Sequence, residues 1–150
     1  MSHATIREIV ATEHIDSAWS LLEAHREELT TNKDLMKLAP RREVYDRIEA
    51  AGALLSLGAF VGDELVGYSV GILDTNLHYG DLVVLQNDLF FVSLEHRARL
   101  GLRLMNETER LAAQRGARMV LWHAKEGSPF ASILDRKGYR VQDIIYSRVI

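Results

Sequence analysis

Apolar residues recur along the chain with two different periods, and these periods predict strands alternating with helices. Residues 4–10, ATIREIV, alternate as a half-buried strand does, whereas the apolar positions from Ile15 to Leu29 recur at the spacing of a helical face. A second helix is predicted between Pro40, which suits a first helical turn, and Gly52, which suits a helix end. The chain is therefore expected to open with one strand and two helices.

Three apolar runs in the middle of the chain are rich in β-forming residues and are separated by short polar turns. They cover residues 54–61, 65–73 and 82–92, and their connections predict an antiparallel meander. The same periodicities predict a helix over 99–116, a strand over 117–123, a helix from Ser128 to about Lys137 and a strand over 139–150. This order predicts one domain, residues 1–150, of the α/β (α+β) class, with a mixed central sheet of about six strands flanked by about four helices. The unit from 82 to 123 is expected to be a parallel crossover.

The composition fits a compact domain and removes several classes of function. The chain has 150 residues, of which 47% are hydrophobic and 26% charged, enough apolar surface for a core. It has no cysteine, which excludes disulfides, thiolate metal sites and a cysteine nucleophile, and no metal site is expected. The net charge of −3 argues against a nucleic acid or an acidic membrane as the partner. No signal-like start and no apolar run of ~18 residues is found, so we expect a cytoplasmic protein.

Positive charge is concentrated where the third apolar run meets the helix predicted after it. The stretch HRARLGLRLM, residues 96–105, places Arg97, Arg99 and Arg103 around Gly101. A strand that leads directly into a helix leaves the first amide groups of the helix unpaired, and the helix dipole adds roughly half a positive charge there. A glycine lets a phosphate approach the backbone, and guanidinium groups pair with its oxygens. The sequence predicts a diphosphate site at this junction, although solvated arginines on an outer helix face would give the same pattern.

The residues around this junction resemble the signature of the GNAT superfamily of acyl-CoA-dependent N-acyltransferases. Val92 ends the strand, Gly101 takes the place of the signature's second glycine, and KGY at 137–139 is similar to a late motif of that family. Four residues follow at the usual offsets: Leu104, Glu109, Ala112 and Gly116. Two places differ, because His96 stands where Gln or Arg is usual and Arg99 where the first glycine is usual. The resemblance covers nearly the whole chain in the order of its elements.

This resemblance implies a GNAT-like fold and the transfer of an acetyl group from acetyl-CoA, as co-substrate, to a primary amine of a small molecule, peptide or protein. In this family the amine attacks the thioester directly, without a covalent enzyme intermediate. The resemblance also implies that coenzyme A would be bound by Phe91, Val92, Arg97, Arg99, Leu100, Gly101, Leu102 and Arg103. The expected partners are thus the thioester and an amine acceptor, and a homodimer is left open.

Direct attack needs a group that removes a proton, because an alkyl amine with a pKa near ~10.4 is protonated at neutral pH. Asp88, in the strand before the junction, and His123, at the end of the next strand, are the two candidate bases. Either could instead be structural: Asp88 as a hydrogen-bonded residue at a β-bulge, and His123 as a hydrogen-bonded histidine at a strand end. The tyrosine acid usual in the family is replaced here by Leu134, so Tyr146 is the predicted acid for the leaving thiolate. The alternatives are Tyr68, Tyr79 and Tyr139.

The resemblance places the acceptor wall in the first two helices and the loop between them. The first of these helices carries Glu23, Glu27 and Glu28, which could attract a cationic amine. A solvated helix face is the more common explanation of such a run.

Three other functions compete with acetyl transfer. A non-catalytic acyl-CoA-binding or regulatory module of the same fold would keep the diphosphate site without turnover. GYSVG at 67–71 fits the Gly-x-Ser-x-Gly motif of α/β-hydrolases. That motif requires a helix after the serine, whereas the apolar run that contains Ser69 is followed by a loop. The basic helix could also bind nucleic acid, but acidic residues interrupt it and no aromatic stacking platform accompanies it.

Overall fold

The computed structural model describes residues 3–150, apart from the side chain of Ala98, and the described chain forms five strands, five α-helices and one short 3-10 helix. In chain order these are β1 (Thr5–Glu8), α1 (Ala11–His14), α2 (Trp19–Leu29), α3 (Arg42–Ala50), β2 (Leu54–Val61), β3 (Glu64–Thr75), β4 (Val83–Val92), η1 (Leu94–His96), α4 (Arg97–Gln114), β5 (Met119–Leu121) and α5 (Pro129–Arg136). The first predicted helix is therefore divided into the single turn α1 and the longer α2.

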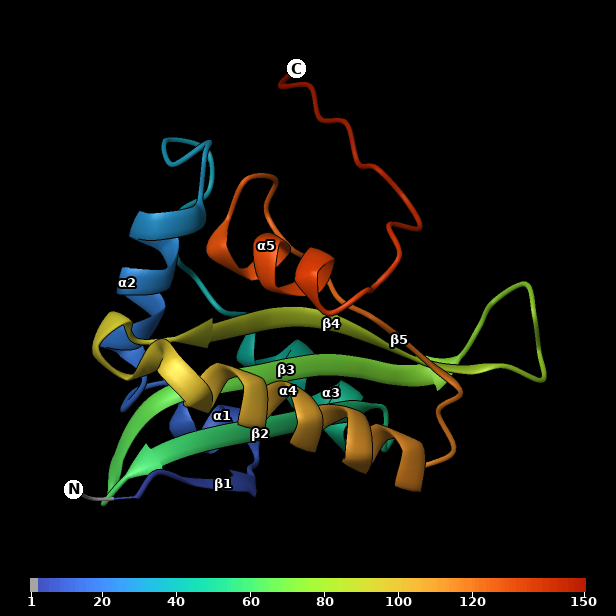
Figure 1. Ribbon diagram of the computed structural model, residues 1–150, viewed down its shortest axis with the longest axis horizontal. Helices are drawn as coiled ribbons and strands as arrows, with labels where there is room; N and C mark the ends of the chain where they lie inside the picture. The colour runs from blue at the N-terminus through green and yellow to red at the C-terminus, as the bar shows by residue number, and fades with distance from the viewer. Residues whose placement is uncertain (1–2) are drawn as a thin grey trace.

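The strands form one mixed sheet with the order β1-β2-β3-β4-β5. Neighbours from β1 to β4 pair antiparallel and β4 pairs with β5 in parallel, which confirms the meander and the parallel pairing of the unit that follows it. Helix α4 lies across one face of the sheet, and α1 and α3 lie behind the other (Figure 1). This arrangement confirms the predicted α+β class and its mixed central sheet.

The predicted strand over 139–150 is wrong. The described chain has five strands rather than six, and after Tyr139 it runs away from the body without regular structure (Figure 1). Ile145 and Tyr146 are 82% and 88% exposed. Alternating apolar residues favour an extended backbone, but a strand also needs a neighbour to pair with. No strand within residues 3–150 lies beside this segment.

Strand β4 is interrupted by a β-bulge and then diverges from β5. Its register against β3 passes from Leu89 opposite Val70 to Asn87 opposite Gly71, which leaves Asp88 as the extra residue. A bulge of this kind bends the strand and increases its twist. Pairing with β5 is confined to the three residues Val84–Gln86. Beyond that point a cluster of three aromatic rings, Phe90, Trp122 and Phe130, fills the space between the strands and α5.

The buried face under α4 joins the sheet through apolar packing and one polar network. Leu104 is fully buried against β2, β3 and β4 residues of the main core. Ser69 is also fully buried, and its hydroxyl accepts hydrogen bonds from Thr108 at 3.0 Å and Asn87 at 3.2 Å. The hydrolase motif requires its serine at a sharp turn between a strand and a helix. Ser69 lies in the middle of β3 instead, which rules that motif out.

Replacing Leu104 with alanine is expected to cost about 2–5 kcal/mol of unfolding free energy, because it leaves a cavity at the centre of the α4 contact. Leu102 lies on the same helix but is only half-buried, so Leu102→Ala should cost clearly less. Urea denaturation of both variants makes the comparison. Equal losses would contradict the assignment of Leu104 to the core.

Candidate functional site

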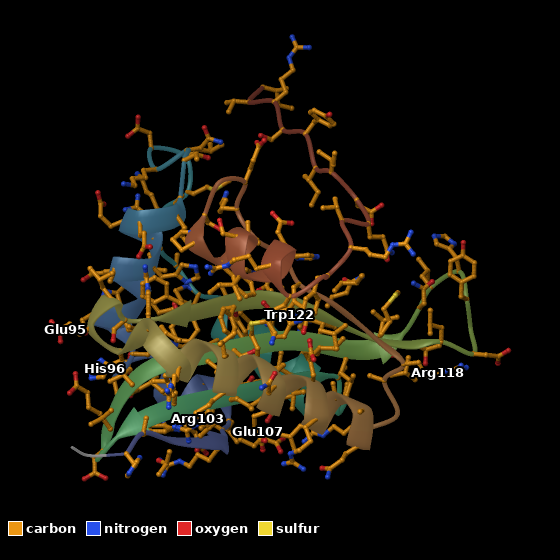
Figure 2. The ribbon with its side chains drawn as sticks, in the orientation of Figure 1. Glu95, His96, Arg103, Glu107, Arg118 and Trp122 are labelled. Atoms are coloured by element: carbon orange, nitrogen blue, oxygen red, sulfur yellow. The ribbon has the colours of Figure 1, made fainter. Side chains whose placement is uncertain are left out.

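The junction between β4 and α4 combines a buried strand end with an uncapped helix start. β4 ends at Val92, which is 5% exposed, and the turn Leu94–His96 leads into α4 at Arg97. His96, the N-cap residue, makes no side-chain capping bond; its Nδ1 is paired with the Ser93 hydroxyl at 2.8 Å. Figure 2 shows Glu95 and His96 at this turn, with Arg103 further along α4. No side chain therefore caps the start of α4, and the anion site at this junction stays a prediction.

Arg97 is held within the protein at this junction. Its Nε donates to the Val92 carbonyl at 2.9 Å, and its two terminal nitrogens pair with both carboxylate oxygens of Glu28 on α2. Its guanidinium also lies 5.2 Å from the centre of the Phe91 ring. The hydrogen bond from Arg97 keeps the pKa of Glu28 below its usual value. Arg97 thus clamps α2 to the end of β4, and the expected contact with a diphosphate would have to be made beside this pair.

The remaining predicted cofactor residues divide into exposed and buried positions. Arg99 and Arg103 are exposed, and Arg103 donates to the Ala4 carbonyl at 3.0 Å. Gly101 lies on an open flank of α4, because a Cβ built on it meets no atom within 4 Å. The buried members are Phe91 and Leu100, at 4% and 6% exposed, while Leu102 is half-buried. Arg99, Gly101 and Arg103 are therefore the accessible part of the predicted set.

A cavity of about 370 Å³ lies on the sheet face covered by α1, α2 and α3. Leu65, Tyr68, Val70 and Leu89 of β3 and β4 form its floor. Its walls come from α1, α2, the loop 36–40 and Tyr45 of α3. Its volume is in the range of pockets that hold small organic ligands. Because β4 contributes both Leu89 and Val92, one strand connects the cavity with the α4 junction.

A histidine–tyrosine pair that no local sequence pattern indicates lies in the lining of this cavity. His25 Nδ1 and the Tyr68 hydroxyl are 2.7 Å apart, and the imidazole stacks on the Phe91 ring at 4.7 Å between centres. Burial lowers the pKa of His25 to about 4, with Glu28 opposing and Arg97 adding to the shift. Burial also raises the pKa of Tyr68. At neutral pH the cavity therefore presents a neutral imidazole and a neutral phenol.

The depressed pKa of His25 should make the folded protein lose stability as the pH falls. The unfolded histidine, with a pKa of 6.5, takes up a proton before the folded one does, so its contribution is complete above pH 6.5 and is lost toward pH 4. At pH 4.5 this loss amounts to about 2 kcal/mol after allowance for partial exposure of the ring. Urea denaturation at pH 7 and pH 4.5 measures it. His25→Gln should show a pH dependence smaller by that amount, and an unchanged dependence would contradict the assignment.

The three predicted catalytic residues are not brought together. Asp88 is exposed at the β4 bulge, close enough to Tyr45 that its charge, after burial, raises the pKa of that tyrosine. His123 is exposed just after β5. Tyr146 is 88% exposed in the segment that leaves the body. Asp88 is thus the candidate nearest to the cavity, through the cavity-lining Tyr45.

Among the alternative tyrosines, Tyr139 has a different and well-defined partner. Its hydroxyl donates to Glu109 of α4 at 2.6 Å, and the same carboxylate oxygen accepts from the Trp122 indole at 2.9 Å. Burial and this hydrogen bond raise the pKa of Tyr139 to about 12. The contact anchors the chain after α5 against α4. Tyr68 is the alternative that lines the cavity.

The acidic residues of α2 are not part of the cavity lining and have partners of their own. Glu23 accepts from the Trp19 indole at 3.1 Å, Glu27 pairs with Lys33 at 2.8 Å, and Glu28 holds Arg97. None of the residues that line the cavity is an aspartate or glutamate. These contacts fit a structural role on a solvated helix face better than attraction of a cationic amine.

Within residues 3–150, no group of three or more His, Cys, Asp or Glu side chains is arranged to hold a metal ion. No helix in this part of the chain is long and apolar enough to cross a membrane.

Comparison with known proteins identifies the fold. No protein-family model and no curated protein sequence matches the chain. Solved structures do match over nearly its full length. They include a ribosomal-protein-alanine N-acetyltransferase from Brucella melitensis biovar Abortus 2308, with a TM-score of 0.70, 19% identity and coverage of 99% of this chain and 98% of that one.

Two aminoglycoside acetyltransferases are similar to the same extent. The enzyme meta-AAC0020 from an uncultured soil metagenomic sample, in complex with sisomicin, has a TM-score of 0.75, 14% identity and coverage of 98% and 96%. The enzyme AAC(6')-Iy in complex with CoA has a TM-score of 0.68, 18% identity and coverage of 99% and 96%. At these identities the likeness concerns the fold, and the chain has the fold of the GNAT acetyltransferases.

Proposed function

We propose that this protein is an N-acetyltransferase that moves an acetyl group from acetyl-CoA to a primary amine by direct attack. The observation that carries the proposal is the sharing of β4 by two sites. Strand β4 ends at Val92, beside the uncapped start of α4. Leu89, about 10 Å earlier along the same strand, lines the cavity. Acetyl-CoA bound at the junction would present its thioester along β4, beside an amine held in the cavity.

The diphosphate of coenzyme A would be held by the start of α4 together with Arg99, Gly101 and Arg103. The first amides of α4 and the two exposed guanidinium groups would supply donors, and the open flank of Gly101 leaves room for phosphate oxygens. AAC(6')-Iy, which has the same fold, was crystallised with CoA. Bound acetyl-CoA supplies an activated acyl group, and this chain's residues orient it and exclude water.

The chemical step requires two protons to leave the ammonium group, one before attack and one as the amide forms, and one proton to reach the departing thiolate. The amine nitrogen forms a bond to the acyl carbon while the carbon–sulfur bond breaks, and the thiolate leaves with its electron pair. We assign Asp88 as the base, with His123 as the alternative, because a carboxylate at the bulge lies beside the cavity wall at Tyr45. Tyr146 as the acid remains a prediction from the sequence. Tyr68, whose pKa is raised by burial, is suited to donate a hydrogen bond rather than a full proton.

The proposal is tested by measuring binding and turnover separately. Calorimetry with coenzyme A, acetyl-CoA and a short oligonucleotide should show binding of the first two only. A thiol reagent should then detect coenzyme A released from acetyl-CoA in the presence of a panel of primary amines. Binding of coenzyme A without amine-dependent thiol release would favour the non-catalytic acyl-CoA-binding module. Absence of coenzyme A binding would overturn both.

A further inference from the structure

The cavity's lining gives information about the acceptor that the fold does not. Its floor is formed by aliphatic and aromatic side chains of β3 and β4, and the residues around it include two cations, Arg26 and Lys37, but no carboxylate. Arg26 is fixed at one wall by hydrogen bonds to the Lys33 and Met36 carbonyls at 2.7 Å and 2.9 Å. Lys37 is exposed at the rim. A ligand in this cavity therefore meets an apolar surface with positive charge at one side.

Such a lining discriminates among amines by charge. The single ammonium group of a monoamine loses its charge when its proton is removed for attack, and its apolar body then gains from contact with the floor. A polyamine or aminoglycoside keeps further positive charges, which would lie near Arg26 and Lys37. Glu23 and Glu27 lie with these two cations at a neighbouring hollow but outside the cavity lining, and Glu27 is already paired with Lys33, so they compensate such charges poorly. The structurally similar meta-AAC0020 was crystallised with an aminoglycoside, sisomicin. The lining of the cavity in this protein favours an acceptor without further positive charges.

Building on the function proposed above, we propose that the acceptor is an apolar monoamine: a primary amine on an aliphatic or aromatic body with no second positive charge. The ring or chain contacts Val70 and Leu89, and the amine lies toward Tyr45 and Asp88. The neutral His25–Tyr68 pair provides the cavity's hydrogen-bonding partners for a polar atom on that body.

The test compares phenethylamine with spermidine and sisomicin in the thiol-release assay. We expect kcat/KM for phenethylamine to exceed that for either polycation by at least tenfold. Ala39→Trp, at an exposed position of the cavity wall, should raise KM for phenethylamine about tenfold while leaving coenzyme A affinity unchanged. Lys37→Glu should narrow the preference over spermidine severalfold. Lys137→Glu, the same charge change at an exposed residue outside the cavity, should leave the preference as it is.

The outcomes separate this proposal from the one on which it rests. Turnover with spermidine or sisomicin in preference to phenethylamine would overturn the acceptor class and leave acetyl transfer intact. An unchanged KM in Ala39→Trp would also overturn it. If no amine is turned over, the proposed acetyl transfer is contradicted. Calorimetric titration of phenethylamine into the wild type and Ala39→Trp then still decides whether the cavity binds apolar monoamines.

A second inference rests on a different observation, the exposed segment of residues 140–150. This segment alternates apolar and polar residues in part, and Ile144, Ile145, Tyr146 and Val149 are 60–88% exposed. Contiguous apolar surface of this kind is rarely left in water and marks an interaction site. The chain around it leaves the body after Tyr139 (Figure 1).

An unpaired sheet edge lies where this segment begins. β5 is the last strand in the sheet order, and no strand within residues 3–150 covers its outer side. Tyr139 is bonded to Glu109, which also holds Trp122 directly after β5, so the segment starts beside the end of that strand. An exposed edge accepts an added strand through main-chain hydrogen bonds.

We infer that residues 140–150 pair along the outer edge of β5 in a second copy of this chain, and that the second copy does the same in return. The segment turns away from its own β5, so reciprocal exchange is the arrangement that covers both edges and both apolar segments. Eleven extended residues span about 36 Å, enough to follow the whole edge.

Light scattering after size exclusion tests the exchange. The wild type should have twice the chain mass of 17.0 kDa. Deletion of residues 140–150, or Ile145→Asp, should give the single-chain mass. Leu77→Asp, which removes an equally exposed apolar residue from the β3–β4 loop, should leave the dimer intact. A monomeric wild type, or a dimer that survives the deletion, would overturn the inference.

Disulfide trapping distinguishes exchange from folding back onto the same chain. The chain has no cysteine, so an introduced pair has no competitors. Chains carrying Arg118→Cys, at the start of β5, are mixed under refolding conditions with differently tagged chains that carry Ile144→Cys. Exchange predicts a disulfide between the two tags. A double variant that forms the disulfide only within one chain would show pairing to its own edge and would overturn the exchange.

Discussion

Gly101→Glu should weaken coenzyme A binding at least 100-fold while making the folded protein more stable. The flank of Gly101 is open, so a larger side chain meets no atom. Glycine inside a helix costs about 1 kcal/mol relative to good helix formers, and an acidic residue near a helix N-terminus is favourable. The variant should therefore gain about 1 kcal/mol in urea denaturation. Its carboxylate would occupy the place where the diphosphate is proposed to bind and would repel the phosphate charges. Calorimetry with coenzyme A measures the loss of affinity.

Two matched variants separate charge from shape at this position. Gly101→Ala should share the gain in stability and lose at most about tenfold in affinity, because a methyl group narrows the flank without adding charge. Gln114→Glu adds the same charge to the exposed far end of α4 and should leave affinity unchanged. An unchanged affinity of Gly101→Glu for coenzyme A would show that coenzyme A does not bind at this junction and would remove the basis of the proposed function.

The parts of this fold that local patterns predict are those stabilised by local interactions. Helix α5 begins as expected, with the Ser128 hydroxyl accepting from the Ala131 amide at 3.2 Å and Pro129 in the first turn. The meander and α4 follow from the spacing of apolar residues alone. The charged start of α4 was likewise visible, because Arg99, Gly101 and Arg103 are neighbours in the chain.

The parts that were missed depend on contacts between distant residues. The apolar stripe of α2 passes through position 25, between Leu22 and Leu29, and so places His25 on the inner face, but its partner Tyr68 is 43 positions away and no local pattern reveals the pair. Arg97 looks like a free cation in the sequence, yet Glu28, 69 positions earlier, neutralises it. The segment after Tyr139 has the alternation of a strand, but alternation does not say whether a neighbouring strand is present.

A bulge in β4 is an alternative that the sequence leaves open at Asp88, and its presence decides which way that side chain faces. In a regular strand Asp88 would share a face with Phe90 and Val92, both of which pack against the α4 core. As the extra residue opposite β3 it is exposed instead, within the electrostatic reach of Tyr45. A carboxylate that would be unpaired and costly in the core thus becomes available for proton transfer.

Asp88→Asn should lower kcat for amine acetylation by about 100-fold, the typical contribution of a positioned base. Coenzyme A affinity should not change, because Asp88 lies outside the α4 junction. His123→Ala should keep most of the activity, and the reverse pattern would assign the base to His123.

The asparagine keeps the shape of the side chain and removes its charge, so a structural role would leave kcat largely intact. A second measurement checks the geometry without turnover. Burial and, after it, the charge of Asp88 raise the pKa of Tyr45. Loss of that charge should bring the pKa of Tyr45 partly back toward 10 in an ultraviolet titration. An unchanged titration of Tyr45 together with an unchanged kcat would remove Asp88 from the site, because neither its position nor its charge would then act at the cavity.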